Sequence, residues 1–385
     1  MKQSKERILT THVGSLPRPR SLLDDLTSAQ HRSGAHAAFD AQLRSAVAEI
    51  VHKQAELGID IVDDGEFSKP SFVTYVNERL GGFEPGPPRG SLWGGSREVR
   101  AFPEYYEWAA QSGLSPAGRQ NRLRCTGPVT YKGQALVQKD IENLKLALKT
   151  VPVEDAFLPA ISPSLIEDWH LNEYYKSEEE FLFALAEAMH EEYKTIADSG
   201  LLVQIDDPRL STYYLLNPDK SIEQCRAWAE VRVEALNHAL RGIPEDRVRF
   251  HTCYSINMGP RVHDMELKHM VDILLKVHAG AYSFEFANPR HEHEWRVWEH
   301  VKLPEGKVLI PGFITQSTIL VEHPELVAER ILRFAGVVGR ERIIAGADCG
   351  FATFAGSLEI HPSIVWEKFR SLAEGARMAS RELWK

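Results

Sequence analysis

The stretch RVRFHTC (residues 247–253) is a short apolar run that ends in two chemically active side chains. Residues two apart on a β-strand point to the same face, so His251 and Cys253 would point the same way. A histidine beside a cysteine is usually part of a packed core. The pair indicates a site only if other runs of the chain end in the same manner.

Further short runs along the chain also end in glycine, proline or polar residues, and longer amphipathic stretches separate them. Ser177 before three glutamates, and Gly200 farther on, mark the two ends of one predicted helix. Strands that alternate with helices predict repeated βα units on a parallel sheet. The predicted strands are RILTTHVGS (7–15), GIDIVDDGE (58–66), RLRCTGP (122–128), AFLPAISP (156–163), LLVQIDDP (201–208), RVRFHTC (247–253), AYSFEFAN (281–288), KVLIPGF (307–313) and RIIAGADCG (342–350).

A chain of 385 residues suits either a (β/α)₈ TIM-type barrel or a large doubly wound sheet. The barrel is favoured because active side chains end many different runs, and a barrel gathers the carboxyl ends of its strands in one cup. The runs number one more than a barrel needs, and the sequence does not identify the extra one. We expect an α/β fold with a single catalytic barrel domain over residues 1–385. The residues at the run ends are His12 and Ser15, Asp64 and Glu66, Asp206 and Asp207, His251 and Cys253, Glu285 and Asn288, and Asp348 and Cys349.

Residues 84–121 stand apart from this alternation because they are rich in glycine, proline and aromatic residues. The segment is too long for a simple βα loop, and such insertions often cover active sites. We expect either a cap over the site or a hairpin on the surface.

Composition excludes several classes of function. Lys and Arg total 45 against 54 Asp and Glu, a net charge of −9, which argues against a nucleic-acid binder or a protein of anionic membranes. No apolar run is long enough to span a bilayer, and the first residues lack the apolar core of a signal peptide, so we expect a cytoplasmic protein. Cys125 and Cys225 carry no partner signal and are expected to be buried apolar thiols.

Two further predicted strands end in residues that could bind a metal together with His251 and Cys253. Glu285 ends the run after RVRFHTC, and Cys349 ends the last run. One His, two Cys and one Glu suit Zn²⁺ in a tetrahedral shell. Ligands drawn from separate strand ends favour a catalytic zinc over a structural one, because a large domain needs no metal to hold it together. Zinc with two thiolate ligands can hold a substrate thiol as thiolate, which predicts alkylation of a small thiol.

Six motifs in this order resemble the catalytic barrel of the cobalamin-independent methionine synthase family and its single-barrel relatives, which include the epoxyalkane:coenzyme M transferases. The resemblance spans roughly residues 10 to 355, and the ordered set is more specific than any one of its members. The motifs are TTHVGSLPRP (10–19), DDGEF (63–67), QIDDP (204–208), HTC (251–253), SFEFANP (283–289) and ADCG (347–350).

The resemblance implies a zinc site formed by His251, Cys253, Glu285 and Cys349. It also implies that Gly14 and Ser15 bind the carboxylate of homocysteine, and that Glu66 and Asp206 bind its amino group. Two carboxylates for one ammonium, and amide and hydroxyl donors for a carboxylate, are chemically well matched.

The sequence also departs from the family pattern. The full-length enzymes have a second barrel that helps to hold folate, and this chain resembles only the catalytic one. Thr315, Gln316 and Ser317 stand where those enzymes have Asp, Ile and a proposed general-acid His. Asp207 replaces the Glu of their IDEP motif.

The most favoured function is zinc-dependent methyl transfer to homocysteine. The methyl donor would be a folate or a corrinoid, and a corrinoid donor would imply a corrinoid protein as a possible partner. Opening of an epoxide by coenzyme M is the alternative within the family. A metal-independent barrel lyase that uses Glu66 and Asp206, or a degenerate metabolite-binding protein, are the alternatives of other classes. HEHEW (291–295) has the composition of a metal motif, but we interpret it as a charged helix start.

Overall fold

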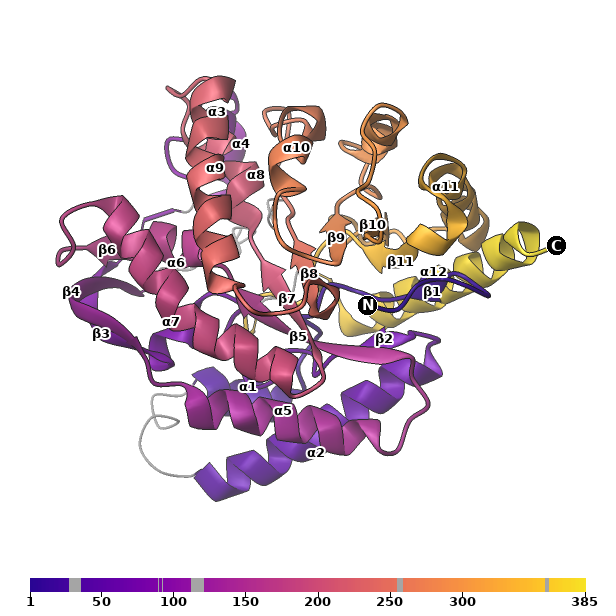
Figure 1. The fold of residues 1–385 in the computed structure, drawn as a ribbon, viewed down its shortest axis with the longest axis horizontal. Helices are drawn as coiled ribbons and strands as arrows, with labels where there is room; N and C mark the ends of the chain where they lie inside the picture. The colour runs from indigo at the N-terminus through magenta and orange to yellow at the C-terminus, as the bar shows by residue number, and fades with distance from the viewer. Residues whose placement is uncertain (28–35, 89, 92, 112–120, 255–258, 357–359) are drawn as a thin grey trace.

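The computed structural model describes residues 1–27, 36–88, 90–91, 93–111, 121–254, 259–356 and 360–385. Within them, eight parallel strands form one sheet in the order β1-β11-β10-β9-β8-β7-β5-β2. A parallel bridge between Thr11 and Ile61 brings the two edges together, so the sheet is a (β/α)₈ TIM-type barrel, as the alternating runs predict (Figure 1). The strands are β1 (Leu9–Thr10), β2 (Ile61–Val62), β5 (Asp155–Ile161), β7 (Leu202–Asp206), β8 (Val248–His251), β9 (Ala281–Phe284), β10 (Val308–Ile314) and β11 (Ile344–Ala347).

The run that the barrel does not use is RLRCTGP. It lies in β4 (Asn121–Tyr131), which pairs antiparallel with β3 (Leu80–Pro88) and parallel with β6 (Leu171–Asn172). This small sheet packs beside helix α7 (Glu178–Asp198), outside the barrel (Figure 1). The other eight predicted runs each contain one barrel strand.

The described part of the predicted insertion 84–121 contains the end of β3 and the short helices α3 (Arg97–Ala101) and α4 (Pro103–Gln111). Residues 89, 92 and 112–120 of this segment lie outside the described residues. From α3, the carboxylate of Glu98 accepts hydrogen bonds from the backbone N–H groups of Arg261 (3.0 Å) and His263 (2.9 Å). The insertion therefore contacts the segment that follows Cys253.

Side-chain caps fix where the helices begin. The Oγ of Ser177 accepts from the N–H of Glu180 (3.1 Å), and three glutamates fill the first turn of α7, as the sequence predicts. None of the helices in the described ranges is both long and apolar enough to cross a bilayer. The remaining helices are α1 (Arg20–Thr27), α2 (His36–Glu56), α5 (Gln134–Leu148), α6 (Pro163–Trp169), α8 (Pro208–Leu216), α9 (Ile222–Ala239), α10 (Val271–Leu274), α11 (Pro324–Val338) and α12 (Pro362–Leu383).

Two apolar clusters form the core. The larger lies between the barrel strands and the surrounding helices, and the smaller consists of side chains from seven of the barrel strands. Arg249 of β8 is fully buried, with its guanidinium 3.8 Å from the ring centre of Phe157. Its two terminal nitrogens donate to Thr11 Oγ1 (3.1 Å) and to the carbonyl of His12 (2.9 Å), which satisfies a charge that would otherwise be costly to bury. The smaller cluster contains Leu9, Ile61, Phe157, Leu202, Ala281, Val308, Ile310 and Ile344.

Candidate active site

His251, Cys253 and Cys349 come together at the carboxyl ends of β8 and β11. One ligand atom from each lies within 4.8 Å of the others, and all three side chains are buried. The Sγ atoms of Cys253 and Cys349 are 3.3 Å apart. Strands β9 and β10 separate β8 from β11 in the sheet, so the three side chains meet only because the barrel brings its strand ends into one cup.

The imidazole of His251 leaves one ring nitrogen available to bind a ligand. Its Nδ1 lies 3.1 Å from Ser283 Oγ on β9, while its Nε2 is buried and has no hydrogen-bond partner among the described residues. Burial lowers the pKa of His251 to about 3, with a smaller contribution from the charge of Arg249, so the ring is neutral at physiological pH. A neutral imidazole nitrogen beside two thiols is a donor set that fits Zn²⁺.

The three side chains line a narrow cavity of about 20 Å³, which has room for about one water molecule. Three residues that the sequence assigns to substrate binding line the same cavity: Ser15, Glu66 and Asp206. Its other lining residues are Val13, Phe72, Pro208, Gly350 and Thr353. The structure thus brings six of the eight candidate residues together, although they come from five regions of the sequence.

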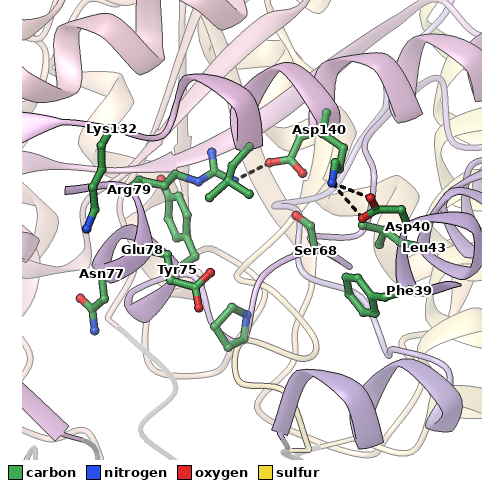
Figure 2. A pocket seen from close by; sticks show the side chains of 13 residues that line it. Phe39, Asp40, Leu43, Ser68, Tyr75, Asn77, Glu78, Arg79, Lys132 and Asp140 are labelled. Atoms are coloured by element: carbon green, nitrogen blue, oxygen red, sulfur yellow. Dashed lines mark hydrogen bonds and ion pairs between the residues drawn. The ribbon is translucent and has the colours of Figure 1, made fainter. Parts of the chain in front are cut away.

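A larger cavity of about 460 Å³ lies elsewhere, between α2 and the start of α5 (Figure 2). None of the candidate residues lines it. Four of its six charged residues are already paired, since Arg79 contacts Asp140 (2.5 Å) and Lys139 contacts Asp40 (2.8 Å). The first site is therefore the better candidate for chemistry, despite its smaller volume.

Glu66 sits on a strained turn after β2. Its φ of 58° lies in the left-handed region that side chains seldom occupy, and such strain is typical of functional positions. Side chains within the turn hold it there, because Asp63 accepts from the N–H of Gly65 (2.9 Å) and Asp64 from that of Glu66 (2.9 Å). The buried Oε2 of Glu66 has no hydrogen-bond partner among the described residues, and the Nζ of Lys69 lies 3.6 Å away.

Asp206 and Asp207 have different tasks although they are adjacent. Asp207 caps α8, because its carboxylate accepts from the N–H groups of Arg209 (3.1 Å) and Leu210 (3.2 Å). Asp206 instead faces the cavity, and burial together with the charge of Glu66 raises its pKa well above the usual range. Glu66 has Lys69 nearby, whereas burial disfavours the ionised form of Asp206, and a bound cation would favour that form.

Gly14 does not line the cavity but lies directly behind it. Its φ is 140°, and a Cβ there would be 2.7 Å from Pro159 Cγ and 3.2 Å from Glu66 Oε1. Glycine is thus required at this position so that the backbone can approach the Glu66 carboxylate.

Two groups near the site were not singled out from the sequence. Arg249 lies on the same strand as His251 and two residues before it, so the same period-two argument would have placed it in the barrel. Lys69 donates to the carbonyl of Pro159 (2.6 Å). Its place three residues after Glu66 was the only sign in the sequence that it could lie near the site.

Two loops cover the cavity. Phe72 and Thr353 belong to segments that the backbone joins, since Phe72 N donates to Thr353 O (3.2 Å) and Ala355 N donates to Pro70 O (2.8 Å). No sequence pattern predicts this pairing, because the segments are far apart and irregular.

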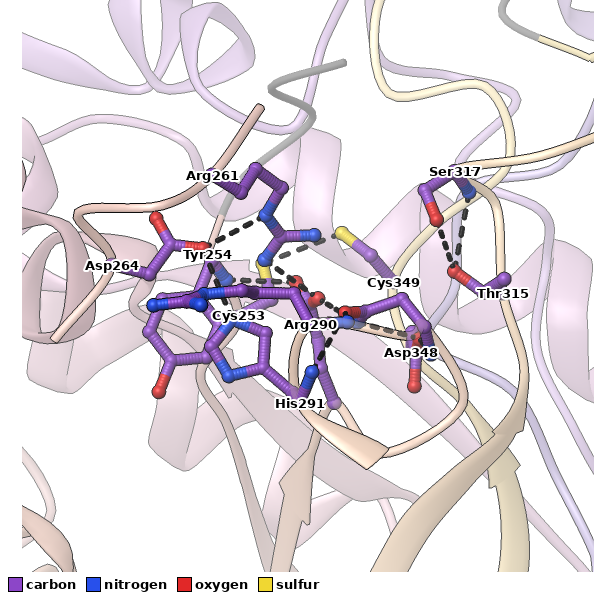
Figure 3. A network of polar contacts seen from close by, with 12 residues as sticks. Cys253, Tyr254, Arg261, Asp264, Arg290, His291, Thr315, Ser317, Asp348 and Cys349 are labelled. Carbon is purple, nitrogen blue, oxygen red and sulfur yellow. Dashed lines mark hydrogen bonds and ion pairs between the residues drawn. The ribbon is translucent and has the colours of Figure 1, made fainter. Parts of the chain in front are cut away.

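Glu285 does not join the three clustered ligands. It ends β9 as predicted, but its Oε1 accepts from the N–H of Tyr254 (2.8 Å), and its Oε2 from Arg261 (2.9 Å) and Asn288 (2.8 Å). Asp348 fixes this loop by accepting from the N–H groups of residues 286–288. Figure 3 shows Arg261 between Asp264 and the two cysteines.

Other residues weighed in the sequence have structural partners. His291 contacts Glu294 (2.8 Å) and Asp264 (3.0 Å) through its two nitrogens, so it is not available as a ligand, in agreement with our interpretation of HEHEW. The ring nitrogens of His12 face Gln54 (2.7 Å) and the N–H of Gly14 (3.2 Å). Thr315 and Ser317 share a hydrogen bond (2.9 Å) on the Cys349 side of the network (Figure 3).

The chain is similar to proteins that are named methionine synthases. The chain is 25% identical over 378 residues to the methionine synthase of Thermococcus kodakarensis, covering 97% of this chain and 94% of that protein. It is also 25% identical over 381 residues to the methionine synthase of Sulfurisphaera tokodaii, with coverage of 97% and 93%.

Among solved structures, the B12-independent methionine synthase from Shewanella sp. W3-18-1, in complex with selenomethionine, has the same fold. The TM-score is 0.74 at 21% identity, and the match covers 98% of this chain and 99% of that one. A putative vitamin-B12-independent methionine synthase from Listeria monocytogenes gives a TM-score of 0.66 at 19% identity, covering 98% and 99%.

The sequence model of one family, described as the catalytic domain of cobalamin-independent synthase, matches residues 8–87 and 160–361. The unmatched part between them contains α3 and α4 of the predicted insertion, followed by β4 and α5. A cobalamin-independent family gives no support to a corrinoid protein as partner, and that expectation is withdrawn. The match covers most of the barrel and all six motifs, and the chain belongs to the cobalamin-independent methionine synthase family.

Proposed function

We propose that this protein is a zinc-dependent methyltransferase that methylates the sulfur of homocysteine to give methionine. The observation that carries the proposal is one cavity lined both by His251, Cys253 and Cys349 and by Glu66 and Asp206. The first group suits a metal that binds sulfur, and the second suits an ammonium group. A small amino acid with a thiol satisfies both.

Family membership and the names of the relatives support the same reaction. The two archaeal relatives are called methionine synthases, and each aligns with nearly the whole of this chain. The clustered ligands also weigh against a metal-independent lyase, which would have no need of two thiols beside a neutral imidazole.

His251 Nε2 and the sulfurs of Cys253 and Cys349 would hold the zinc. When bound, zinc lowers the pKa of a thiol that coordinates it, so the substrate sulfur is a nucleophilic thiolate at neutral pH. Ser283 orients the His251 ring from behind, which keeps Nε2 directed toward the sulfurs.

Glu66 and Asp206 would bind the ammonium group of the amino acid. Glu66 has Lys69 as a counter-charge 3.6 Å away, and Asp206 is protonated more readily than usual because of burial and of the charge of Glu66. An ammonium beside Asp206 would favour the ionised form of this carboxyl, so binding is expected to release a proton from Asp206.

Ser15 and the loops above the cavity would complete the site. The Ser15 hydroxyl can donate to the substrate carboxylate, and Gly350 leaves room for it, because a Cβ at that position would overlap Ser15 Oγ. Phe72 and Thr353 line the cavity beside Ser15. Since the cavity has room for about one water, these joined loops must move when an amino acid binds.

A third cavity, of about 520 Å³, would hold the methyl donor. It is lined by Arg261 of the Glu285 network, and by Arg290, Thr315 and Ser317. Thiol and donor would then approach from different sides. Hydroxyl groups stand where the family has a histidine, so the proton for the leaving group would come from water or from these hydroxyls rather than from an imidazole.

Zinc X-ray absorption tests the proposal without knowledge of the donor. We expect about one zinc per chain, with one nitrogen and two sulfur ligands, and a third sulfur after homocysteine is added. A third sulfur with coenzyme M but not with homocysteine would instead favour the epoxide-opening alternative. Purified protein that binds no zinc would contradict the proposal and support the lyase or a degenerate site.

A further inference from the structure

Glu285 has no free oxygen to offer a metal. Its carboxylate is 2% exposed and accepts three hydrogen bonds, from the Tyr254 N–H, the Arg261 guanidinium and the Asn288 amide. His251 Nε2, by contrast, is buried without a partner among the described residues. His251 therefore has a nitrogen available to bind a ligand, whereas the hydrogen-bonding capacity of Glu285 is already used.

Arg261 is held firmly in its place beside Glu285. Its Nε donates to Asp264 (2.9 Å), and its backbone N–H donates to Glu98 (3.0 Å) of the insertion. The guanidinium is 5.4 Å from the ring centre of Tyr254, which stacks on His291 at 3.8 Å. The φ of Arg261 is 58°, a strained value that the surrounding contacts maintain.

Moving Glu285 onto a metal would break its bond to Arg261. The guanidinium is 5% exposed and would keep only one of its two carboxylate partners. Removing one partner of a buried ion pair is strongly unfavourable, because the remaining charge stays out of water. The ion pair therefore competes with the metal for the same carboxylate.

We propose that zinc in this protein has only three protein ligands, His251, Cys253 and Cys349, and that Arg261 is the positioning residue that keeps Glu285 out of the shell. The inference rests on the proposed zinc site, but differs from the four-ligand set that the family resemblance implies. The fourth position is then open to a thiol from the start.

Charge gives the open position a chemical consequence. A Zn²⁺ ion with two thiolates and a neutral imidazole has no net charge, so a bound substrate thiolate brings the centre to −1. With Glu285 retained, the same step would reach −2 in a buried site, which costs more. A centre of the three-ligand type accepts a thiolate without first losing a carboxylate.

A crystal structure of the zinc-loaded protein tests the inference directly. We expect Glu285 Oε2 to stay within hydrogen-bond distance of Arg261, and no carboxylate oxygen to lie within about 2.2 Å of the zinc. A Glu285 oxygen at that distance would overturn the inference and leave the proposed function standing. Failure of the wild-type protein to bind zinc would overturn both.

Zinc affinities, measured by competition with a chromophoric chelator, test it in solution. Glu285→Gln should bind zinc within about threefold of the wild type, whereas loss of a true ligand would weaken binding by more than about tenfold. Arg261→Met should bind zinc at least about tenfold more tightly, because the freed Glu285 can then coordinate. The double variant Arg261→Met/Glu285→Gln should lack the gain in zinc affinity that Arg261→Met shows.

Two further variants separate this effect from structural damage. Arg261→Lys keeps a cation and should restore the wild-type affinity. Arg290→Met is the matched control, because Arg290 lines the same cavity but donates to the carbonyl of Val262 (2.8 Å) instead of to Glu285. General disruption of the site would weaken zinc binding, so tighter binding by Arg261→Met cannot arise from misfolding. Weaker or unchanged zinc binding by a folded Arg261→Met would contradict the inference. If that variant does not fold, the zinc affinity of Glu285→Gln and the crystal structure test the inference instead.

Discussion

The sulfur atoms of Cys253 and Cys349 lie 3.3 Å apart, although 96 positions of the sequence separate the two residues. They follow β8 and β11, which are not neighbours in the sheet. Such closeness brings two nucleophilic groups within reach of each other and of one metal ion. Without a metal, the same geometry allows the two thiols to react together.

We predict that mild oxidation with diamide joins Cys253 to Cys349 in metal-free protein and that bound zinc prevents it. Thiolates held by a metal are less available to attack another sulfur. Mass spectrometry of unreduced peptides would detect the crosslink. Cys125→Ser should behave as the wild type, because that thiol lies on β4 in the small sheet. Equal crosslinking with and without zinc would show that the metal does not bind both sulfurs.

Removing either acidic group of the cavity should weaken substrate binding but leave the metal in place. For Glu66→Gln and Asp206→Asn we expect homocysteine to bind zinc-loaded protein roughly 10- to 100-fold more weakly, since a hydrogen bond to a charged group contributes about 1.5–3 kcal/mol. Titration calorimetry would measure the change, and metal analysis would show unchanged zinc. Glu78→Gln is the matched control, because Glu78 is exposed and lines the separate cavity of Figure 2. An equal loss in the control would contradict the assignment.

The barrel could be predicted from the sequence because each strand carries its own signal. Eight short apolar runs, six of which end in active residues, each correspond to one barrel strand. The ninth run, now β4, has the same local pattern but pairs with β3 in a separate sheet. Local patterns cannot reveal which partner a strand chooses, since that depends on contacts between distant segments.

Part of the site followed from the same reasoning, and part did not. Period-two alternation placed His251 and Cys253 on one face, and the barrel brought Cys349 to them. The partner of Glu285 could not be foreseen, because Arg261 lies on an irregular segment with positive φ that no periodic pattern describes. Both its place at a strand end and the family resemblance led us to expect Glu285 as a zinc ligand, and the contacts of this carboxylate argue against it.

Gly14→Ala should weaken homocysteine binding through Glu66. The new Cβ would lie 2.7 Å from Pro159 and 3.2 Å from the Glu66 carboxylate, at a φ that alanine rarely adopts. We expect a loss of roughly 1–3 kcal/mol in unfolding free energy from strain, and weaker binding in calorimetry. Gly336→Ala in α11 is the control, because a Cβ there meets nothing within 4 Å. That change should stabilise by about 0.5–1 kcal/mol. Normal homocysteine affinity in Gly14→Ala would show that Glu66 does not depend on this close approach.

The buried imidazolium of His291 predicts a loss of stability at alkaline pH. Although burial lowers its pKa, hydrogen bonds to Asp264 and Glu294 outweigh this and raise the pKa to about 9, above the ordinary value of 6.5. A raised pKa stabilises the folded state fully below pH 6.5, and this contribution is lost as pH rises through 9. Its size is roughly 3 kcal/mol, from a shift of about 2.5 pH units.

Urea denaturation of metal-free protein between pH 6 and pH 10 measures this contribution. We expect His291→Gln to be less stable than the wild type at pH 6, and the difference to narrow by roughly 3 kcal/mol by pH 10. His293→Gln is the matched control, since His293 belongs to the same HEHEW sequence but is exposed, and it should leave the pH profile unchanged. If the difference in unfolding free energy between His291→Gln and wild type stays constant with pH, His291 is neutral in the folded protein. Arg261 would then be the only cation that contacts Asp264 among the described residues.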